Sequence, residues 1–497
     1  MTRASLTLLL IAILCAFVAD IEVTTLDPWG ELGRMAWGAL TPDASVLYTF
    51  RNALLNTVTF AFCGISLGIV AGGLLSAGFQ LTPVRLFCGF IRAIHEIFWA
   101  FLFLPVVGLN PVCGILAIGI PYAGVFAKVY SEIWQEADRR PLRGLPATAS
   151  GLSRFLYGLL PLTLPALRNY TSYRFECALR SSAVLGFIGL PTLGFHLETA
   201  FREGLYSEAA ILMYAFYLLI GSLRYWVKPR LIPLYVLLSI GLTSTAIRLS
   251  WANLTRFFSY EILPWPIRRQ GFVDGSGDLS LPVDQTWTWL VTRFTDQALP
   301  GIYDTAILTQ IALAATGLLT LLALPSICRH FASPLVSRLS HYVLIVARTT
   351  PEYILAYIFV QLWGPSLLPA IAAIALHNGA ILAYLSGQHA DRIQLRLDAP
   401  GRRADRYGFE VLPRIYGQLL AFLFYRWEIM MRESAILGIL GITTLGFFID
   451  SAIAEDKMDQ FVLLLLVTAF LNMGIDSLSQ RLRKGLHISI GSVKTVE

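Results

Sequence analysis

Charged side chains are scarce in this sequence, and their scarcity sets it apart from soluble proteins. Only 14% of its 497 residues are Asp, Glu, Lys or Arg, while 56% are hydrophobic. A soluble domain carries roughly 25% charged residues. The phosphate-binding pattern GxxxxGK[ST] and the zinc-binding pattern HExxH are also missing. These absences argue against ATP hydrolysis or zinc-dependent hydrolysis by this chain.

Cysteine is infrequent, and its placement predicts no metal site. The six cysteines form no CxxC pair, and most of them lie within apolar runs, where a small buried hydrophobe is the ordinary role. They are Cys15, Cys63, Cys88, Cys113, Cys177 and Cys328. We therefore expect no metal ligands, no disulfide framework and no cofactor bound by this chain.

Long apolar runs recur along the whole chain, and about 12 of them could cross a bilayer as helices. Roughly 20 residues of helix span the roughly 30 Å hydrocarbon core. The spacing of the runs predicts an all-α polytopic membrane protein, with breaks in the two longest runs. The runs lie near 5–19, 54–78, 88–107, 112–131, 157–190, 207–224, 231–249, 304–325, 342–363, 367–386, 412–445 and 461–477.

The net charge of +6 reflects where basic side chains lie and does not indicate nucleic-acid binding. Basic residues gather in alternate loops and in the tail: Arg139, Arg140, Arg143, Arg154, Lys228, Arg230, Arg329, Arg338, Arg402, Arg403, Arg406, Arg481, Arg483, Lys484 and Lys494. The positive-inside rule places these loops and both termini in the cytoplasm. Residues 1–19 show no clear cleavage site and match a second run at 231–249, so we expect a retained anchor helix.

The chain contains an internal repeat. YRFECALRSSAVLGFIGLPTLGF, at 173–195, and YRWEIMMRESAILGILGITTLGF, at 425–447, share 13 of 23 residues at an offset of 252. Upstream, the segments at 92–100 and 348–356 align at an offset of 256. We therefore divide the chain into halves at 1–228 and 229–497, each with an anchor helix and a five-helix core. Such repeats usually flank a transport pathway with pseudo-two-fold symmetry.

Charged side chains lie inside both repeated segments, where burial in a membrane is costly. They are Arg174, Glu176, Arg180, Arg426, Glu428 and Arg432. In one interpretation they pair with each other and hold helices together; in the other, Arg180 and Arg432 line a pathway and favour an oxyanion. We favour the structural role because each of these arginines has a carboxylate four residues before it. Arg92–Glu96 and Arg348–Glu352 have the same spacing.

Glycines follow each charged segment, and long basic loops precede it. The glycines allow close helix packing and a break, so we expect gate or hinge positions at Gly186, Gly189, Gly194, Gly438, Gly441 and Gly446. The loops, at about 132–156 and 387–411, each end at a Leu-Pro step where the next membrane span begins, namely Leu160-Pro161 and Leu412-Pro413. We interpret both loops as docking surfaces.

The segment from Pro146 to Gly194 resembles the permease subunit of phosphonate-type ABC importers. That family carries a cytoplasmic loop of the form EAAxxxGAS…YGVLP, followed by YRFE…RSATVLGxxGAGGIG. The matching residues are Ala149, Ser150, Leu152, Phe155, Tyr157, Gly158, Leu160, Pro161, Tyr173, Arg174, Phe175, Glu176, Arg180, Ser181, Val184, Leu185, Gly186 and Gly189. The resemblance covers roughly 40–224 and, more weakly, 280–485.

This resemblance implies two tandem type I ABC-importer permease domains in a bacterial inner membrane. The loops would then couple to two copies of a separate ABC ATPase subunit, which hydrolyses ATP, through Arg143, Gly144, Thr148, Ala149, Ser150, Leu160, Pro161, Pro400, Gly401, Leu412 and Pro413. A soluble or lipid-anchored binding protein would deliver a phosphonate-like anion from outside. The segments at 20–50 and 250–300 would help that protein to dock, or, around WTWLVTRF, form an interfacial helix.

The sequence also departs from the family pattern at several positions. One other class of protein, the ion-coupled secondary transporters, is an alternative to an ABC permease. The usual loop glycine is Thr148 and the usual glutamate is Leu142, while the second copy has Pro400 and Gln394 at the counted positions. These changes weaken the assignment to phosphonate more than the assignment to ABC permeases. An ion-coupled secondary transporter also has repeats and buried charges, but it has no use for paired cytoplasmic docking loops.

Overall fold

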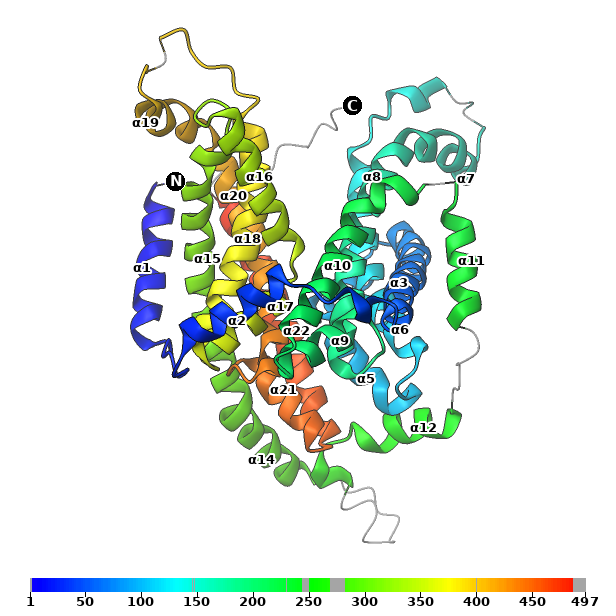
Figure 1. Cartoon of the computed structure of the whole chain (residues 1–497). Helices are drawn as coiled ribbons and strands as arrows, with labels where there is room; N and C mark the ends of the chain where they lie inside the picture. The colour runs from blue at the N-terminus through cyan, green and yellow to red at the C-terminus, as the bar shows by residue number, and fades with distance from the viewer. Residues whose placement is uncertain are drawn as a thin grey trace, which may run out of the picture. The chain divides into compact units, whose positions relative to one another are not determined.

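The computed structural model describes residues 2–485 except 145, 147, 229, 244–249, 269–281 and 399. Parts of the expected second anchor, of the 250–300 segment and of both docking loops therefore lie outside the described residues, as does Lys494. Every regular element in the described ranges is helical (Figure 1). The chain forms two compact units, one from Met1–Arg34 with Phe258–Val496 and one from Met35–Phe257.

Within the described ranges, six helices are long and apolar enough to cross a membrane, which confirms the all-helical polytopic fold. They are α3 (Arg51–Ala77), α6 (Pro111–Glu136), α10 (Tyr206–Trp226), α15 (Leu299–Ile327) with the preceding α14 (Val283–Arg293), α18 (Leu367–Ala390) and α22 (Met458–Gly485). Four bent helix pairs raise the number of candidate spans to 10. The segment that contains WTWLVTRF is continuous with α15, so it extends a span at its N-terminal end.

Two of the expected spans are sharply bent in the structure. The run at 88–107 divides into α4 (Thr82–Ala93) and α5 (Glu96–Val107), and the run at 342–363 into α16 (Pro334–Thr349) and α17 (Glu352–Trp363). The bends measure 91° and 93°. The expected four-residue pairs Arg92–Glu96 and Arg348–Glu352 therefore do not lie on one helix, because the backbone leaves the helical region at Ile94 and Thr350. Thr350 precedes a proline, which disfavours helical backbone at that residue.

The breaks expected after the charged segments are present in both units. The helix α8 (Leu160–Val184) ends in the 3-10 turn η4 (Leu185–Ile188) and bends by 54° into α9 (Leu193–Arg202). The helix α20 (Leu412–Ser434) ends in η9 (Ala435–Leu440) and bends by 44° into α21 (Leu445–Ala454). Gly189 and Gly441 close these turns at φ values of 87° and 82°, which glycine adopts without steric cost.

The other glycines at the breaks allow backbone to touch backbone. A Cβ atom on Gly194 would lie 1.8 Å from the Ala183 carbonyl oxygen, and one on Gly446 would lie 1.7 Å from the Ala435 carbonyl oxygen. Cβ atoms on Gly186 or Gly438 would lie 2.0 Å from a backbone nitrogen across the turn. These distances explain why the repeat carries glycine there, independently of any gating role.

A threonine caps the helix that follows each break. The Leu193 amide at the start of α9 donates to Thr57 Oγ1 on α3 at 2.9 Å. The Leu445 amide at the start of α21 donates to Thr305 Oγ1 on α15 at 3.1 Å. Both threonines are buried. The cap satisfies a helix N–H group that would otherwise lie without a hydrogen-bond partner at membrane depth.

The helices begin earlier than the Leu-Pro steps indicated. Before Leu160 the chain is already helical, as α7 (Gly151–Arg154) and the π-turn η3 (Phe155–Leu159), and before Leu412 as α19 (Arg403–Asp405) and the π-turn η8 (Arg406–Val411). A third π-turn, η7 (Phe294–Ala298), precedes Leu299-Pro300. Proline has no N–H to donate back along the helix, and a widened turn lies before all three prolines. The prediction that the loops end at these steps is wrong.

The two anchor helices pack on cores in a way that the repeat did not indicate. The helix α1 (Thr2–Val18) packs against α15, and α11 (Ile232–Thr243) packs against α3 (Figure 1). Backbone hydrogen bonds from Thr24 N to Trp363 O and from Leu367 N to Asp20 O, both 2.9 Å, fix the segment after α1. Each anchor thus belongs to the unit that contains the other repeat's core. The tandem boundary at 228 remains a prediction about the sequence repeat.

The remaining elements are short and connect these helices. They are α2 (Pro28–Leu40), η1 (Ala44–Leu47), η2 (Arg140–Gly144), α12 (Trp251–Arg256) and η6 (Phe257–Glu261). The segment after η6 is tied down at Asp459 on α22, whose carboxylate accepts from Trp265 N at 3.0 Å and pairs with Arg268 at 3.1 Å. Part of the expected extracytoplasmic segment is therefore attached to its unit.

The glycine packing at the break generates a stability prediction. We expect Gly194→Ala to destabilise the protein by about 1–3 kcal/mol, since the new methyl group meets backbone that has no room to move. The measurement is the melting temperature of the detergent-solubilised chain. Gly221→Ala on α10 is the matched control, because no atom lies within 4 Å of its Cβ position. Equal melting temperatures for the two variants would contradict the packing argument.

Candidate functional site

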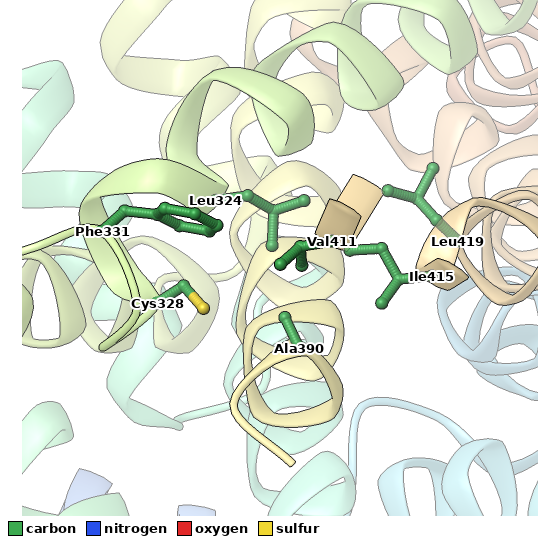
Figure 2. Close-up of a cluster of buried hydrophobic side chains, with 7 residues drawn as sticks. All are labelled: Leu324, Cys328, Phe331, Ala390, Val411, Ile415 and Leu419. Atoms are coloured by element: carbon green, nitrogen blue, oxygen red, sulfur yellow. The ribbon is translucent and has the colours of Figure 1, made fainter. Parts of the chain in front are cut away.

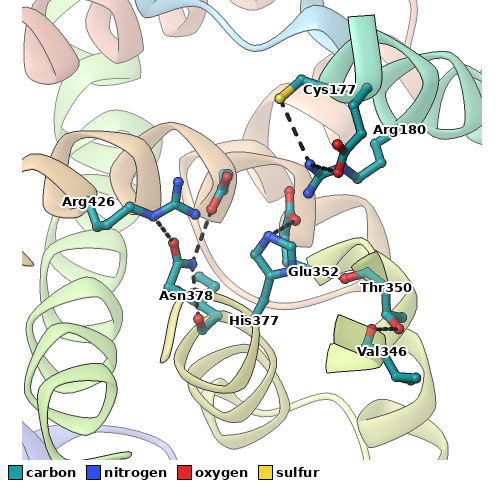
Figure 3. Close-up of polar contacts among 11 residues, drawn as sticks. Cys177, Arg180, Val346, Thr350, Glu352, His377, Asn378 and Arg426 are labelled. Atoms are coloured by element: carbon teal, nitrogen blue, oxygen red, sulfur yellow. Dashed lines mark hydrogen bonds and ion pairs between the residues drawn. The ribbon is translucent and has the colours of Figure 1, made fainter. Parts of the chain in front are cut away.

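The charged segment of the first repeat lies on α8, and its expected ion pair is present. Arg180 Nη2 lies 3.4 Å from Glu176 Oε1, one helical turn away. The same guanidinium lies 3.9 Å from the sulfur of Cys177 (Figure 3). Both charged side chains are partly exposed, with 17% of Arg180 and 33% of Glu176 accessible. Glu428 and Arg432 occupy the equivalent positions on α20 and are also partly buried.

The other repeated arginine has different surroundings in the two units. Arg174 Nε donates to the Tyr170 hydroxyl at 2.7 Å, and its guanidinium lies over the rings of Tyr170 and Tyr173. Arg426 is only 9% exposed, and its Nε donates to Asn378 Oδ1 on α18 at 2.6 Å (Figure 3). Arg426 is thus fixed by a neighbouring helix, as the structural interpretation expects of a buried charge.

Asn378 connects Arg426 to a partly buried carboxylate. The Asn378 Nδ2 group donates to Glu433 Oε2 at 3.3 Å, while its Oδ1 accepts from Arg426. An amide can accept from a cation and donate to an anion at the same time, so one side chain bridges both charges. Glu433 was not among the expected site residues, although it stands directly after Arg432 in the second repeat.

A histidine lies against a glutamate in each unit, at different positions in the repeat. In one unit His377 Nδ1 donates to the Thr350 carbonyl at 2.8 Å, and Nε2 lies 3.6 Å from Glu352 Oε2 (Figure 3). A carbonyl only accepts, so Nδ1 is protonated, and an attractive Nε2–carboxyl contact requires another proton on one of the two groups. His377 therefore lies between the Thr350 carbonyl and the Glu352 carboxyl group.

The other unit holds its glutamate with a neutral histidine. His95 Nδ1 accepts from the Ile97 amide at 3.3 Å, which leaves the ring proton on Nε2, 3.4 Å from Glu96 Oε2. Ser181 donates to the other oxygen of Glu96 at 3.3 Å, and the Tyr122 hydroxyl lies 3.4 Å from Ser181. In the repeat alignment, Ser181 and Tyr122 stand where the second half has Glu433 and Asn378. At these positions the second half therefore carries one more carboxylate than the first.

The bends explain why these partners differ from the expected ones. We placed Glu96 and Glu352 one helical turn after Arg92 and Arg348, on a single helix. The chain instead turns by 91° and 93° between the two members of each pair. Each glutamate begins a new helix and is directed toward its histidine. The four-residue spacing of an arginine and a glutamate in the sequence does not show whether the chain bends between them.

The two loops that connect the long helices share a repeated clamp. Here the first connecting loop is residues 137–150 and the second is residues 391–402. Arg154 Nη2 donates to the Pro146 carbonyl at 3.4 Å, and Arg406 Nε donates to the Pro400 carbonyl at 3.1 Å. These arginines lie 252 residues apart, and each fixes one proline carbonyl of its loop.

Further contacts fix each loop individually. Ser150 caps α7, its hydroxyl accepting from the Ser153 amide at 3.2 Å. In the second loop, Glu410 accepts from the Arg396 amide at 3.1 Å and pairs with Arg414 at 2.7 Å. The other residues expected to couple to an ATPase differ in exposure. The exposed ones are Gly144, Thr148, Pro161, Gly401 and Pro413, and the partly buried ones are Ala149, Leu160, Pro400 and Leu412. The backbone of Arg143 lies in η2.

An exposed aromatic side chain lies beside each loop, and sequence analysis did not single out the pair. Tyr157 in η3 and Phe409 in η8 are each 79% exposed, and they occupy equivalent repeat positions. Exposed apolar residues Leu152 and Leu397 accompany them. Large apolar side chains repeated on a solvent- or lipid-accessible face are typical of a surface that another molecule covers.

Two repeated cores with broken spans and buried charges define a membrane transport permease built from two related halves. No family model matches the chain. It is similar to the phosphate-import permease protein PhnE of Mycolicibacterium smegmatis, with 24% identity over 464 residues, covering 88% of this chain and 84% of the relative. It is also similar to the phosphite transport system permease protein PtxC of Stutzerimonas stutzeri, with 25% identity over 40% of this chain and 76% of that protein.

A third relative shows the family. The cryptic phosphonate transport system permease protein PhnE2 of Escherichia coli K12 is 37% identical over 99 residues, which cover 20% of this chain and 81% of that protein. The chain belongs to the permease family of phosphonate-type ABC importers. A crystal structure of an amino acid ABC transporter with histidines superposes at a TM-score of 0.33 and 15% identity, over 39% of this chain and 96% of that one.

The bridging role of Asn378 generates a prediction. We expect Asn378→Leu to destabilise the solubilised protein by about 1.5–3 kcal/mol, since it removes a hydrogen bond to a buried cation and leaves Glu433 without this donor. The measurement is thermal unfolding in detergent.

A double substitution tests the cause. Adding Arg426→Met removes the buried charge, so the double variant should be more stable than Asn378→Leu alone. Arg174→Met is the comparison in the other repeat, and it should cost less because Arg174 is only partly buried. Strictly additive losses for Asn378→Leu and Arg426→Met would contradict the bridge.

Proposed function

We propose that this chain is the membrane-spanning subunit of an ATP-driven importer, with both transport halves fused in one polypeptide. Family membership carries the assignment to ABC import permeases. The single structural observation that supports coupling to ATPases is the repeated pair of clamped loops with exposed apolar side chains. A secondary transporter needs no such pair.

We propose two ATPase subunits as partners, one for each connecting loop. The loops carry a matched arginine clamp and a matched exposed aromatic residue, so each offers a preformed surface with an apolar anchor. The chain lacks a phosphate-binding loop of its own. ATP would therefore be hydrolysed by the partners, and this chain would move in response.

We propose a phosphonate, phosphite or phosphate-like oxyanion as the transported substrate. The relatives with those three names support this substrate class. Arg180 and Arg432 support it chemically, since a guanidinium presents a planar fork that suits tetrahedral oxyanions. An extracytoplasmic binding protein would deliver the anion to a chain in the bacterial inner membrane with both termini in the cytoplasm. The distribution of basic loops supports that orientation.

The aromatic pair generates the first functional prediction. We expect the tagged chain, purified in mild detergent from cells that express its transporter, to retain two copies of a Walker-motif ATPase. The double variant Tyr157→Ser with Phe409→Ser should lose most of that ATPase, because each substitution removes an apolar anchor from a docking surface. Mass spectrometry and band densitometry give the stoichiometry.

Trp287→Ser is the matched control for that experiment. Trp287 on α14 is also an exposed aromatic residue, 65% accessible, but it lies far along the chain from either loop. It should leave the ATPase bound. A wild-type chain that purifies alone and transports on an ion gradient would overturn the proposed function in favour of a secondary transporter.

The arginine pair generates the second functional prediction. Arg180→Gln with Arg432→Gln should lower uptake of radiolabelled phosphate, phosphite or phosphonate by roughly tenfold or more, since charge-assisted hydrogen bonds of about 1.5–3 kcal/mol would be lost. The amount of folded protein, measured by size-exclusion elution, should stay unchanged.

Arg202→Gln controls for loss of a helical ion pair. Arg202 pairs with Glu198 at 2.8 Å with the same four-residue spacing, but it is 73% exposed, and such surface pairs contribute little. The Arg202→Gln variant should transport the anion at the wild-type rate. Loss of folded protein in the double variant would show that Arg180 and Arg432 act in helix packing, and uptake at the wild-type rate would exclude them from the pathway.

A further inference from the structure

Three potential metal ligands meet at the end of α15, away from the transport segments. Cys328 is the C-terminal cap of α15, His330 lies in the turn that follows, and Asp391 is the C-terminal cap of α18. One donor atom from each residue lies within 4.8 Å of the others. The apolar run around Cys328 predicts only a packing role for it, and no sequence pattern singles out His330.

The cysteine and the aspartate already lie close to the spacing that a shared metal ion requires. Cys328 Sγ is 3.1 Å from Asp391 Oδ1. Two ligands of a tetrahedral zinc ion, at bond lengths of 2.0–2.3 Å, lie roughly 3.5 Å apart. The histidine nitrogen, within 4.8 Å, needs a displacement on the order of 1 Å, which rotation of its side chain in a turn can supply.

The surroundings of Cys328 also suit a bound thiolate. The backbone N–H of His330 donates to the sulfur, and such hydrogen bonds stabilise negative charge on it. A metal ion that binds here displaces the thiol proton, which passes to solvent.

His330 supplies an observation that is independent of the cysteine. Its Nε2 atom is shielded from solvent and has no hydrogen-bond partner among the described residues. A shielded ring nitrogen without a partner is uncommon, because burial of an unsatisfied polar group costs about 1–3 kcal/mol. A metal ion would satisfy this nitrogen.

The one cation paired with Asp391 in the described ranges does not block the site. Arg329 Nε lies 4.0 Å from Asp391 Oδ2, and the Arg329 side chain is 86% exposed. Its backbone amide donates to Asp391 Oδ1 at 2.8 Å and orients the carboxylate. An exposed pair of this length contributes little, so the guanidinium can move into solvent at small cost.

We propose that Cys328, His330 and Asp391 form a binding site for a zinc-class divalent cation. A thiolate, an imidazole and a carboxylate are the donors that zinc takes in proteins, and a water molecule completes four-coordination. The proposed site departs from our expectation that no residue of this chain binds metal.

The location gives the ion a structural role. Cys328 packs with Phe331 and Ala390 in a buried cluster that also contains Val411 and Ile415, from the end of η8 and the start of α20 (Figure 2). The second connecting loop leaves α18 at Asp391 and reaches α19 and η8 at Arg403. A metal ion would therefore tie the ends of α15 and α18 together at the base of that loop.

The test is cobalt binding to the full-length chain. The protein is purified in detergent, stripped with a chelator, kept reduced with a phosphine and titrated with Co²⁺. We expect one Co²⁺ per chain, with a sulfur-to-cobalt charge-transfer band that added Zn²⁺ abolishes. Cys328→Ser should abolish the band, and His330→Gln should weaken binding at least about tenfold.

Matched variants separate this site from other cysteines and histidines. Cys88→Ser removes another buried cysteine, and His341→Gln removes another partly buried histidine of the same unit; both should bind cobalt as the wild type does. Size-exclusion elution identifies variants that fail to fold. If Cys328→Ser does not fold, the His330→Gln variant still tests the site. A wild-type chain without the band, or equal binding in His330→Gln, would overturn the site. Neither outcome depends on the transport assignment.

Discussion

The structure depends on one constraint: where a helix breaks at membrane depth, the protein itself must satisfy the exposed backbone groups. Each unit meets this constraint in the same way. A buried threonine of the first core helix, Thr57 or Thr305, accepts from the first amide after the break. Glycine on both sides of the break lets the two backbone segments that flank it come into close contact. The charged segment of α8 or α20 ends directly before the break.

The two halves share this backbone arrangement but differ in the polar side chains that it carries. Glu96 is held by His95 and Ser181, whereas Glu352 is held by His377, a residue from another helix. Glu433 and Asn378 add a carboxylate and an amide where the first half has a hydroxyl on each residue. Fusion in one chain allows each half to change independently.

The anchor helices show that a sequence repeat and a structural unit need not coincide. The repeat alone suggested that each anchor packs on the core that follows it. Instead α1 packs on α15 and α11 packs on α3, and the chain passes between units within α2 and again near Phe257. Each anchor is short, with 17 or 12 residues described, and apolar over most of its length. A helix of this kind fits many apolar surfaces, so its own sequence does not specify its partner.

The sequence by itself determined the helical membrane class, the repeat, the break after each charged segment and the Arg180–Glu176 pair. These features follow from local rules: apolar length, glycine and a four-residue spacing on one helix. Only the tertiary structure decided the 91° and 93° bends, the histidine partners of Glu96 and Glu352, the role of Asn378 and the meeting of Cys328, His330 and Asp391. Each of these depends on which helix lies next to which, and such contacts are set by packing between segments far apart in the chain.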